Sequence, residues 1–212
     1  MRKAISIIVI SMMATQIWAS SSIEESWKNM PDSIISYFNA AVRTEMLDMY
    51  NITHGTKTKN LLGGQCWIDS VSNDLIEMHI NESTTLQIAT FTCNDSTKIM
   101  CMVKGYGQPT HESSISFYTE EWRRIDSTFG LPDTRDAKLM LNMLTHRPDS
   151  ISESRYNESI KMIEPVMVTA TITSEHEIIF NINNSMLTKD ENREVDKIKK
   201  KKCFKWNGKI FK

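Results

Sequence analysis

Alternating apolar and polar positions mark three neighbouring strands in the middle of the chain, between Asp74 and Gly105. This alternation has the period of two that is typical of a half-buried strand. A run of turn residues, Asn94–Thr97, separates the last two strands. We therefore expect an antiparallel meander at the centre of the fold. One alternation consists of Ile76, Met78, Ile80, Leu86, Ile88, Thr90, Thr92, Ile99, Cys101 and Val103.

The two turns set the strand pairing that we expect within this meander. If Cys93 faces Lys98, then Thr90 faces Cys101. A turn at residues 81–85 places Ile80 opposite Leu86. Both registers gather the alternation on one face, and this agreement favours them because a slip of one residue would turn a whole strand over.

The other face of the expected meander carries an apolar spot among polar residues. It is formed by Phe91, Met100 and Met102. A helix or a partner is expected to cover such a spot. These three residues are our candidate interaction face.

The segments before and after the meander also carry recognisable patterns. Apolar residues at helical spacing predict a helix over 23–51, capped by Asp32 or Ser33, or two helices if the chain breaks near Asn39. A short strand at 65–71 is expected to lead into the meander. A fourth strand is predicted at 115–118, with Trp122 packed at its end.

The second half of the chain repeats the order of helix and strands. A helix is predicted from Asp133 or Thr134 to about Arg147, and a charged, exposed helix at 188–202. Strands are predicted at 160–171 and 177–183, and Pro165 assigns the first part of the former to an edge. Asn207-Gly208 predicts a closing hairpin over 204–211.

This repeated order indicates an α+β fold in which antiparallel meanders are covered by helices. Met30-Pro31-Asp32-Ser33 is similar to Leu131-Pro132-Asp133-Thr134, and duplication explains the likeness about as well as convergent helix capping does. Two meanders joined edge to edge, with helices on one face, fit the order. We expect one domain over 20–212, which could divide into halves at 20–130 and 131–212.

The first residues have the pattern of a secretory signal peptide. Arg2 and Lys3 precede an apolar stretch from Ala4 to Ile17, and Ala19 offers a small residue for cleavage. The stretch is too short to span a membrane well, and no later stretch could cross one. The mature chain is therefore expected to be exported and soluble.

Composition narrows the partners and leaves the disulfide pairing open. The chain has 212 residues and a formal net charge of −1, so nothing favours nucleic acid or an anionic membrane as a partner.

Export permits disulfides, and Cys66, Cys93, Cys101 and Cys203 allow three connectivities. The expected register opposes a Cys93–Cys101 bond, because it places the two on opposite faces.

Candidate chemistry in the sequence has a simpler interpretation in each case. Cys66, between Gly64 and Trp67, faintly resembles the nucleophile of thiol proteases, but a loop leading into a strand is favoured. Glu77 with His79, and likewise residues 175–177, could bind a metal, but the His-Glu-x-x-His spacing is missing and solvated outward positions are favoured. We assign no catalytic residue, cofactor or metal.

A basic run near the C-terminus consists of Lys197 and Lys199–Lys202. It could contact acidic lipid headgroups or a polyanion. Acidic residues precede it, so a solvated linker is the favoured interpretation.

Several blocks of the chain resemble a known family. The more specific ones are Cys101-Met102-Val103-Lys104 and the terminal Lys205-Trp206-Asn207-Gly208; the others are Met30–Ile34, Ile99–Lys104, and Ser114–Tyr118 with Trp122. Their order and spacing resemble domain of unknown function 3256, a family of exported proteins of Bacteroidales bacteria. The resemblance implies a Gram-negative envelope setting and transfers no activity or site residue. After Lys104, where relatives often carry more cysteine and proline, this chain has Gly105-Tyr106-Gly107.

Two classes of function follow from these observations. The first is a non-catalytic envelope protein that binds a protein or a small ligand through one sheet face. The second is a hydrolase with an unfamiliar site built from dispersed acids and histidines. The missing catalytic motif and the semi-apolar face favour the first.

The signal-peptide prediction can be tested directly. Expression of the full chain with its own N-terminus in a Bacteroidales host should yield an envelope protein that begins at Ser20, as read by N-terminal sequencing. A protein that retains residues 1–19 in the cytoplasm would contradict the prediction.

Overall fold

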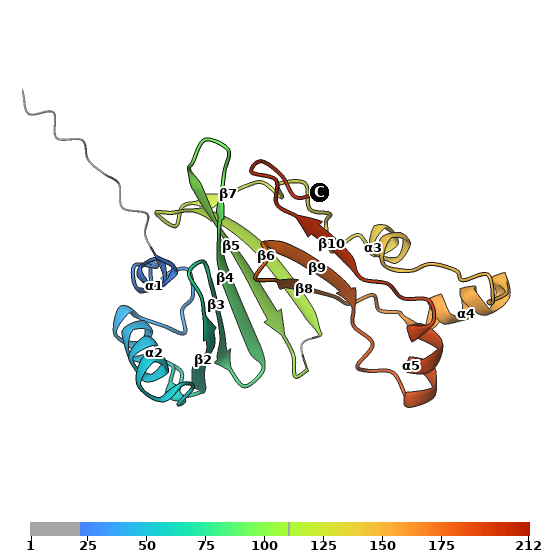
Figure 1. Cartoon of the computed structure of the whole chain (residues 1–212). Helices are drawn as coiled ribbons and strands as arrows, with labels where there is room; N and C mark the ends of the chain where they lie inside the picture. The colour runs from blue at the N-terminus through green and yellow to red at the C-terminus, as the bar shows by residue number, and fades with distance from the viewer. Residues whose placement is uncertain (1–21, 110) are drawn as a thin grey trace, which may run out of the picture.

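The structure, a computed structural model, describes residues 22–109 and 111–212. The expected signal peptide and its cleavage after Ala19 lie outside these residues. The described chain forms five helices, a seven-stranded sheet and a three-stranded sheet, all strand pairs being antiparallel. This is the α+β class that the sequence predicts. Figure 1 shows α1 and α2 on one side of the large sheet and β8 to β10 on the other.

The N-terminal segment forms two helices, α1 (Ile23–Lys28) and α2 (Ala40–Thr53). Asn39 caps α2, since its side chain accepts a hydrogen bond from the Val42 amide. Capping by Asp32 or Ser33 is therefore wrong. Those residues belong to a turn in which the Ile34 amide donates to the Pro31 carbonyl.

The large sheet is a meander whose spatial order follows the sequence. Strand β2 occupies the range expected for it, and β6 extends the expected fourth strand in both directions. Trp122 is buried beyond its end, near Tyr118. The strands are β1 (Thr58–Lys59), β2 (Gln65–Val71), β3 (Leu75–Asn81), β4 (Thr84–Thr92), β5 (Lys98–Tyr106), β6 (Glu112–Thr119) and β7 (Arg124–Ile125).

The register between β4 and β5 differs from the prediction by one residue. Thr92 pairs with Lys98 and Thr90 with Met100, because the turn is one residue shorter than expected. The Cys93 amide donates to the Thr97 carbonyl, and Ser96 adopts a left-handed φ of 68°. Strand β5 is therefore turned over. Between β3 and β4 the shift is two residues, with Met78 opposite Leu86, so those faces are kept.

This register removes the expected interaction face. Phe91 points toward the small sheet, whereas Met100 and Met102 point toward α1 and α2. Their exposed fractions are 0%, 0% and 4%, respectively. The three side chains therefore fill two separate cores and do not share an open surface.

The large sheet is buried on both faces. One core lies under α1 and α2 and includes Trp27, Phe38 and Met100. The other lies under the small sheet and includes Phe91, Phe117 and Phe180. Because fully burying one such side chain stabilises a fold by roughly 1.5–3 kcal/mol, both cores are major contributors to stability.

The second half forms the small sheet and three helices. The elements are α3 (Ala137–Leu144), α4 (Glu153–Met162), β8 (Val168–Ile172), β9 (Glu177–Ile182), α5 (Lys189–Asp196) and β10 (Lys202–Lys205), and the sheet order is β10-β9-β8. The first part of the strand predicted from residue 160 is wrong, since Ser152 caps α4, which runs to Met162. The strand at β9 is confirmed, and the charged helix is confirmed as α5, which ends at Asp196 and does not continue to residue 202. The closing turn is also confirmed, with Trp206 paired to Phe211.

The segments that suggested duplication do not cap helices. Asp136, and not Asp133 or Thr134, caps α3, and the Asp136 amide donates to the Asp133 carbonyl in a turn. The two sheets pack face to face across the core that contains Phe91, so the expected edge-to-edge joining is wrong.

One side chain aligns the two sheets. The Gln87 amide of β4 donates from Nε2 to the Ile172 carbonyl at 3.1 Å, and its Oε1 accepts from the Ile172 amide at 2.8 Å. Nearby, the Ser113 hydroxyl donates to the Ala170 carbonyl at 3.5 Å. These contacts satisfy backbone groups at the free edge of β8.

Substitution Gln87→Ala should lower the free energy of unfolding by about 1–3 kcal/mol, since it leaves the Ile172 amide and carbonyl without this partner. Urea unfolding measures the change. Gln65→Ala, at the exposed start of β2, is the matched control and should change stability far less. Equal effects would contradict the importance of the contact.

Candidate functional site

Cys66 is placed where it cannot act as a nucleophile. Its side chain is 0% exposed inside β2, and Sγ lies 3.7 Å from the Thr58 carbonyl. Burial, aided by the charge of Glu45, raises the pKa of the Cys66 thiol to about 11. Because the thiolate is the reactive form, this environment suits a core residue.

Glu77 and His79 point toward the small-sheet side of β3 and have structural partners. Glu77 accepts hydrogen bonds from Ser70 and Gln87. His79 stacks on Trp67 with a centroid separation of 4.1 Å, and its Nε2 lies 3.5 Å from Asp69 Oδ2. Among residues 22–109 and 111–212, no three acids, histidines or cysteines converge as metal ligands do.

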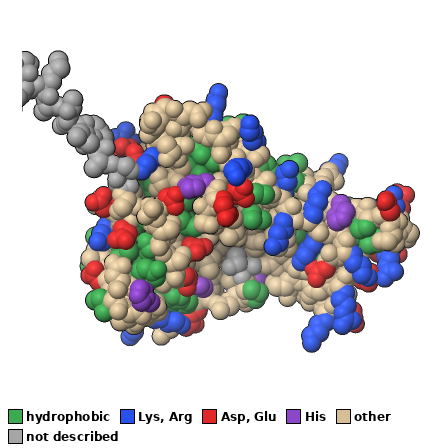
Figure 2. Space-filling view, viewed as in Figure 1, with side chains coloured by type: hydrophobic (Ala, Val, Ile, Leu, Met, Phe, Trp, Pro, Cys, Tyr) green, Lys and Arg blue, Asp and Glu red, His purple; other side chains and the backbone are tan. Residues whose placement is uncertain are grey.

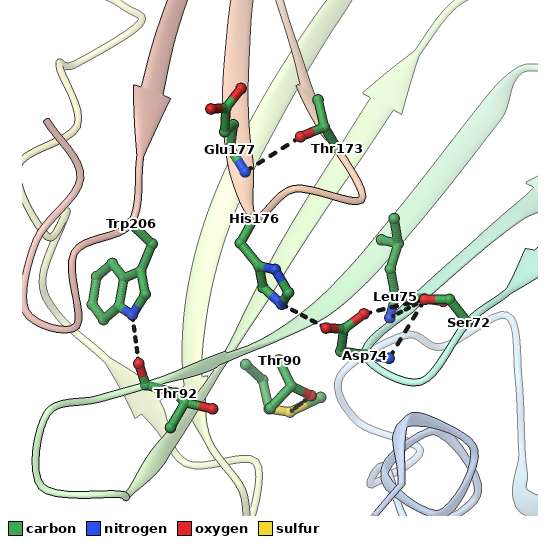
Figure 3. A network of polar contacts seen from close by, with 10 residues as sticks. Ser72, Asp74, Leu75, Thr90, Thr92, Thr173, His176, Glu177 and Trp206 are labelled. Carbon is green, nitrogen blue, oxygen red and sulfur yellow. Dashed lines mark hydrogen bonds and ion pairs between the residues drawn. The ribbon is translucent and has the colours of Figure 1, made fainter.

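His176 joins the two sheets at their turns (Figure 3). Its Nε2 lies 2.6 Å from Asp74 Oδ2, linking the β8–β9 turn to the β2–β3 turn. The Ser72 hydroxyl donates to the other carboxylate oxygen at 3.2 Å. Because the carboxylate lies between Ser72 and His176, the imidazole is not placed to take the serine proton, as a nucleophilic pair requires.

The same region holds two further contacts between distant segments. The His176 ring meets the ring of Phe91 edge to face at 5.6 Å. Trp206 donates from its indole nitrogen to the Thr92 carbonyl at 2.7 Å (Figure 3). A hollow of about 420 Å³ opens beside His176. These contacts mark the region as the junction between the sheets.

The basic run is partly neutralised by the helix that precedes it. Lys197 pairs with Glu194 at 2.6 Å, and Lys199 pairs with Asp196 at 2.7 Å. Lysine and arginine side chains are prominent over the part of the surface that carries α5 and β10 (Figure 2). The alternation of both signs agrees with a solvated face.

A more voluminous hollow runs along β6, and we call it the β6 groove. Its volume is about 680 Å³, compared with about 390 Å³ for the hollow between Gln87 and the edge of β8. This size lies within the range of ligand sites in proteins. The groove is lined by Tyr106, Glu112–Phe117 on β6, Arg124–Thr128 and Leu131–Arg135.

The β6 groove is rich in hydroxyl groups and carries two arginines, of which one is paired with a carboxylate. Ser114 Oγ lies 3.2 Å from the Tyr106 hydroxyl, and Ser116 Oγ accepts a hydrogen bond from Arg124 at 3.2 Å. Arg135 is bound by Asp133 through two hydrogen bonds of 3.0 and 2.9 Å. Arg124 is exposed and pairs with no carboxylate of the described residues.

Sequence reasoning missed this groove although it found the strand that lines it. The groove exists because β7 pairs with β6 only at Phe117 and Tyr118, after which the chain departs from the sheet. The available signal was the run Asp126-Ser127-Thr128 directly after Ile125, which consists of residues that favour turns over strands.

Comparison with other proteins places this architecture. Residues 15–211 match the profile of the family described as protein of unknown function (DUF3256). No curated protein matches. A solved structure, titled "Structure of a domain of an uncharacterized protein from Porphyromonas gingivalis W83", has a TM-score of 0.71 at 15% identity, covering 92% of this chain and 98% of that chain. At this identity the likeness establishes a shared fold.

The fold and the site define a class of α+β proteins in which a large antiparallel meander lies between two helices and a smaller sheet. Within that class, the match over residues 15–211 shows that this chain belongs to the DUF3256 family of uncharacterised proteins. No helix of the described residues is both long and apolar enough to cross a lipid bilayer.

The cysteines should differ sharply in reactivity. All four thiols are free, and only Cys203 is exposed. Burial raises the pKa values of Cys66 and Cys101, so an alkylating reagent at mildly alkaline pH should modify both only after denaturation. Cys203 should react in the folded protein. Mass spectrometry of peptides measures the order.

A matched variant tests the cause at Cys203. Its thiol donates to Glu177 at 3.0 Å, and this carboxylate raises the pKa of the Cys203 thiol. Glu177→Gln should lower that pKa, increase the thiolate fraction and speed labelling at constant pH. Unchanged or slower labelling would contradict the assigned cause.

Proposed function

We propose that this chain is an exported, non-catalytic binding module of the bacterial envelope and that it holds its partner in the β6 groove. The observation that carries the proposal is the groove itself, about 680 Å³ in volume and lined by hydroxyls, the exposed Arg124 and one side of a sheet strand. Fixed polar groups around a concave surface are what a binding site needs for orientation and specificity.

Export and an envelope setting rest on the N-terminal pattern. Arg2 and Lys3 precede the apolar stretch from Ala4 to Ile17, and Ala19 offers a cleavage position. The resemblance of the chain to DUF3256, a family of exported proteins of Bacteroidales bacteria, also supports an envelope setting.

A hydrolase built from dispersed acids and histidines is the alternative. Its support is limited to two acid–histidine pairs, Asp69 with His79 and Asp74 with His176. The two pairs belong to different parts of the fold, the first to β2 and β3 and the second to the junction of the turns. Each histidine also packs on an aromatic ring. We therefore favour binding as the function.

The test is affinity capture with a variant that fills the groove. Thr128→Trp places a large side chain at an exposed position of the groove lining, and Thr53→Trp, at the exposed end of α2, is the matched control. Both proteins are offered to an envelope extract of a Bacteroidales host. Quantitative mass spectrometry then compares each with the wild-type chain.

A partner that is retained by the wild-type protein and by Thr53→Trp, but reduced at least about tenfold by Thr128→Trp, would support the groove as the binding site, since a tenfold loss corresponds to about 1.4 kcal/mol. Equal retention by all three proteins would contradict this location. Thermal unfolding of both variants excludes loss of fold as the cause.

A further inference from the structure

The outer side of β6 presents backbone groups that no strand of the described residues uses. On its inner side, β6 pairs with β5 along its whole length, from Glu112 to Thr119, without a bulge. On its outer side, β7 pairs only with Phe117 and Tyr118. The segment Glu112–Ser116 is therefore an open sheet edge, and it lies along the β6 groove.

One hydrogen bond identifies the amides that face this edge. The Thr119 amide donates to the Arg123 carbonyl on the β7 side at 2.9 Å. In an antiparallel strand, alternate residues direct both N–H and C=O to the same neighbour. Ile115 and Ser113 therefore direct their backbone groups into the groove, whereas Ser114 and Ser116 direct theirs to β5.

The other sheet edges in the described part of the chain are blunted. The edge of β8 is occupied by the side chains of Gln87 and Ser113. Strand β10 carries Lys202 and Lys205. Beyond its short pairing with β1, β2 has a bulge between Ile68 and Ser70, and its Val71 amide donates to the Tyr50 hydroxyl at 3.3 Å. Lysines and bulges are devices that proteins use to prevent pairing at an edge. Residues 112–116, Glu-Ser-Ser-Ile-Ser, contain no lysine, proline or bulge.

We propose that an extended segment of another polypeptide binds here as an added strand, in line with β7 and antiparallel to β6. This inference rests on the proposed function and specifies the chemistry of the partner. The incoming backbone would exchange hydrogen bonds with Ile115 and Ser113, the mode by which extended peptides join open sheet edges.

The two faces of the edge determine the side chains of the partner. Ile115 packs toward the core that contains Leu131, so the partner residue opposite Ile115 is apolar. Ser116 and Ser114 lie on the other face, with the guanidinium of Arg124 hydrogen-bonded to Ser116. The residue opposite Ser116 is therefore acidic and the residue opposite Ser114 carries a hydroxyl. Ser113 is buried against Ala170 of β8, so the partner residue opposite Ser113 is apolar as well. The partner motif therefore reads acid, apolar, hydroxyl, apolar.

The probe for the test is a synthetic peptide, Asp-Val-Thr-Val-Thr with blocked ends, added at millimolar concentration to the isotope-labelled mature chain. Nuclear magnetic resonance follows the backbone amides. The amides of Ser113 and Ile115 should shift and exchange more slowly with solvent, whereas those of Ser114 and Ser116 should change less, since they already face β5.

Two methylated peptides separate strand addition from binding through side chains. N-methylation of the first valine, which lies opposite Ile115, should weaken binding at least about tenfold, because it removes a hydrogen bond and adds a clash. N-methylation of the following threonine should leave binding nearly unchanged, since its amide faces away from β6. Equal effects of the two would overturn strand addition while leaving the groove as a binding site.

The acidic position is tested with a matched pair of protein variants. Arg124→Ala should weaken the peptide about two- to fivefold, the range expected for an exposed charge pair. Arg123→Ala removes a neighbouring exposed arginine outside the groove lining and should have no such effect. Equal losses would overturn the assignment of the acid opposite Ser116.

The remaining outcomes also decide the proposal. If the amides of Ser113 and Ile115 do not respond to the peptide, the proposal of strand addition is overturned. The proposal that the β6 groove is a binding site would then stand only if Thr128→Trp reduces capture of a partner. If, without peptide, the exchange of these amides with solvent slows as the protein concentration rises, the added strand comes from a second copy of this chain and not from another polypeptide.

Discussion

The register between β4 and β5 is the constraint on which the whole arrangement depends, because the large sheet is buried on both faces. A turn from Asn94 to Ser96, with Ser96 in the left-handed region, pairs Thr92 with Lys98. That pairing sends Met100 under the helices and Cys101 under the small sheet. A shift by one residue would exchange the two sets of side chains, and neither core would then have the volume that its cover requires.

The same double burial explains what the sequence could and could not predict. Alternation located β3, β4 and β5, because each has the period of two. In β5, however, both faces carry apolar residues, Ile99, Cys101 and Val103 on one and Met100 and Met102 on the other. Hydrophobicity alone therefore did not determine which face of β5 lies under the helices and which under the small sheet. The shorter turn depends on the left-handed φ at Ser96. A serine in a sequence does not indicate a left-handed conformation, whereas a glycine would favour it.

Other failures have equally local causes. Helix α4 was missed because its sequence, Glu153–Met162, is largely polar, and its strongest signal was the cap at Ser152. The face-to-face packing of the sheets brings together residues far apart in the chain, such as Gln87 and Ile172, which are 85 positions apart in sequence. The candidate site was missed for a related reason. A strand has an open edge where its neighbour ends early, and this depends on the length of the neighbour. Here the neighbour is β7, which is only two residues long.

The contact made by Gln87 has a consequence for how the two sheets tolerate change. An apolar core accepts exchanges of volume between neighbours, so its contacts have many near-equivalent solutions. The Gln87 amide instead imitates one residue of an adjacent strand, offering a donor and an acceptor at the spacing of a peptide group. Because hydrogen bonds are directional, both bonds keep good geometry only within a narrow range of positions and rotations of β8 relative to β4. Gln87 therefore restricts the angle at which one sheet lies on the other more narrowly than the apolar contacts of the core between the two sheets do.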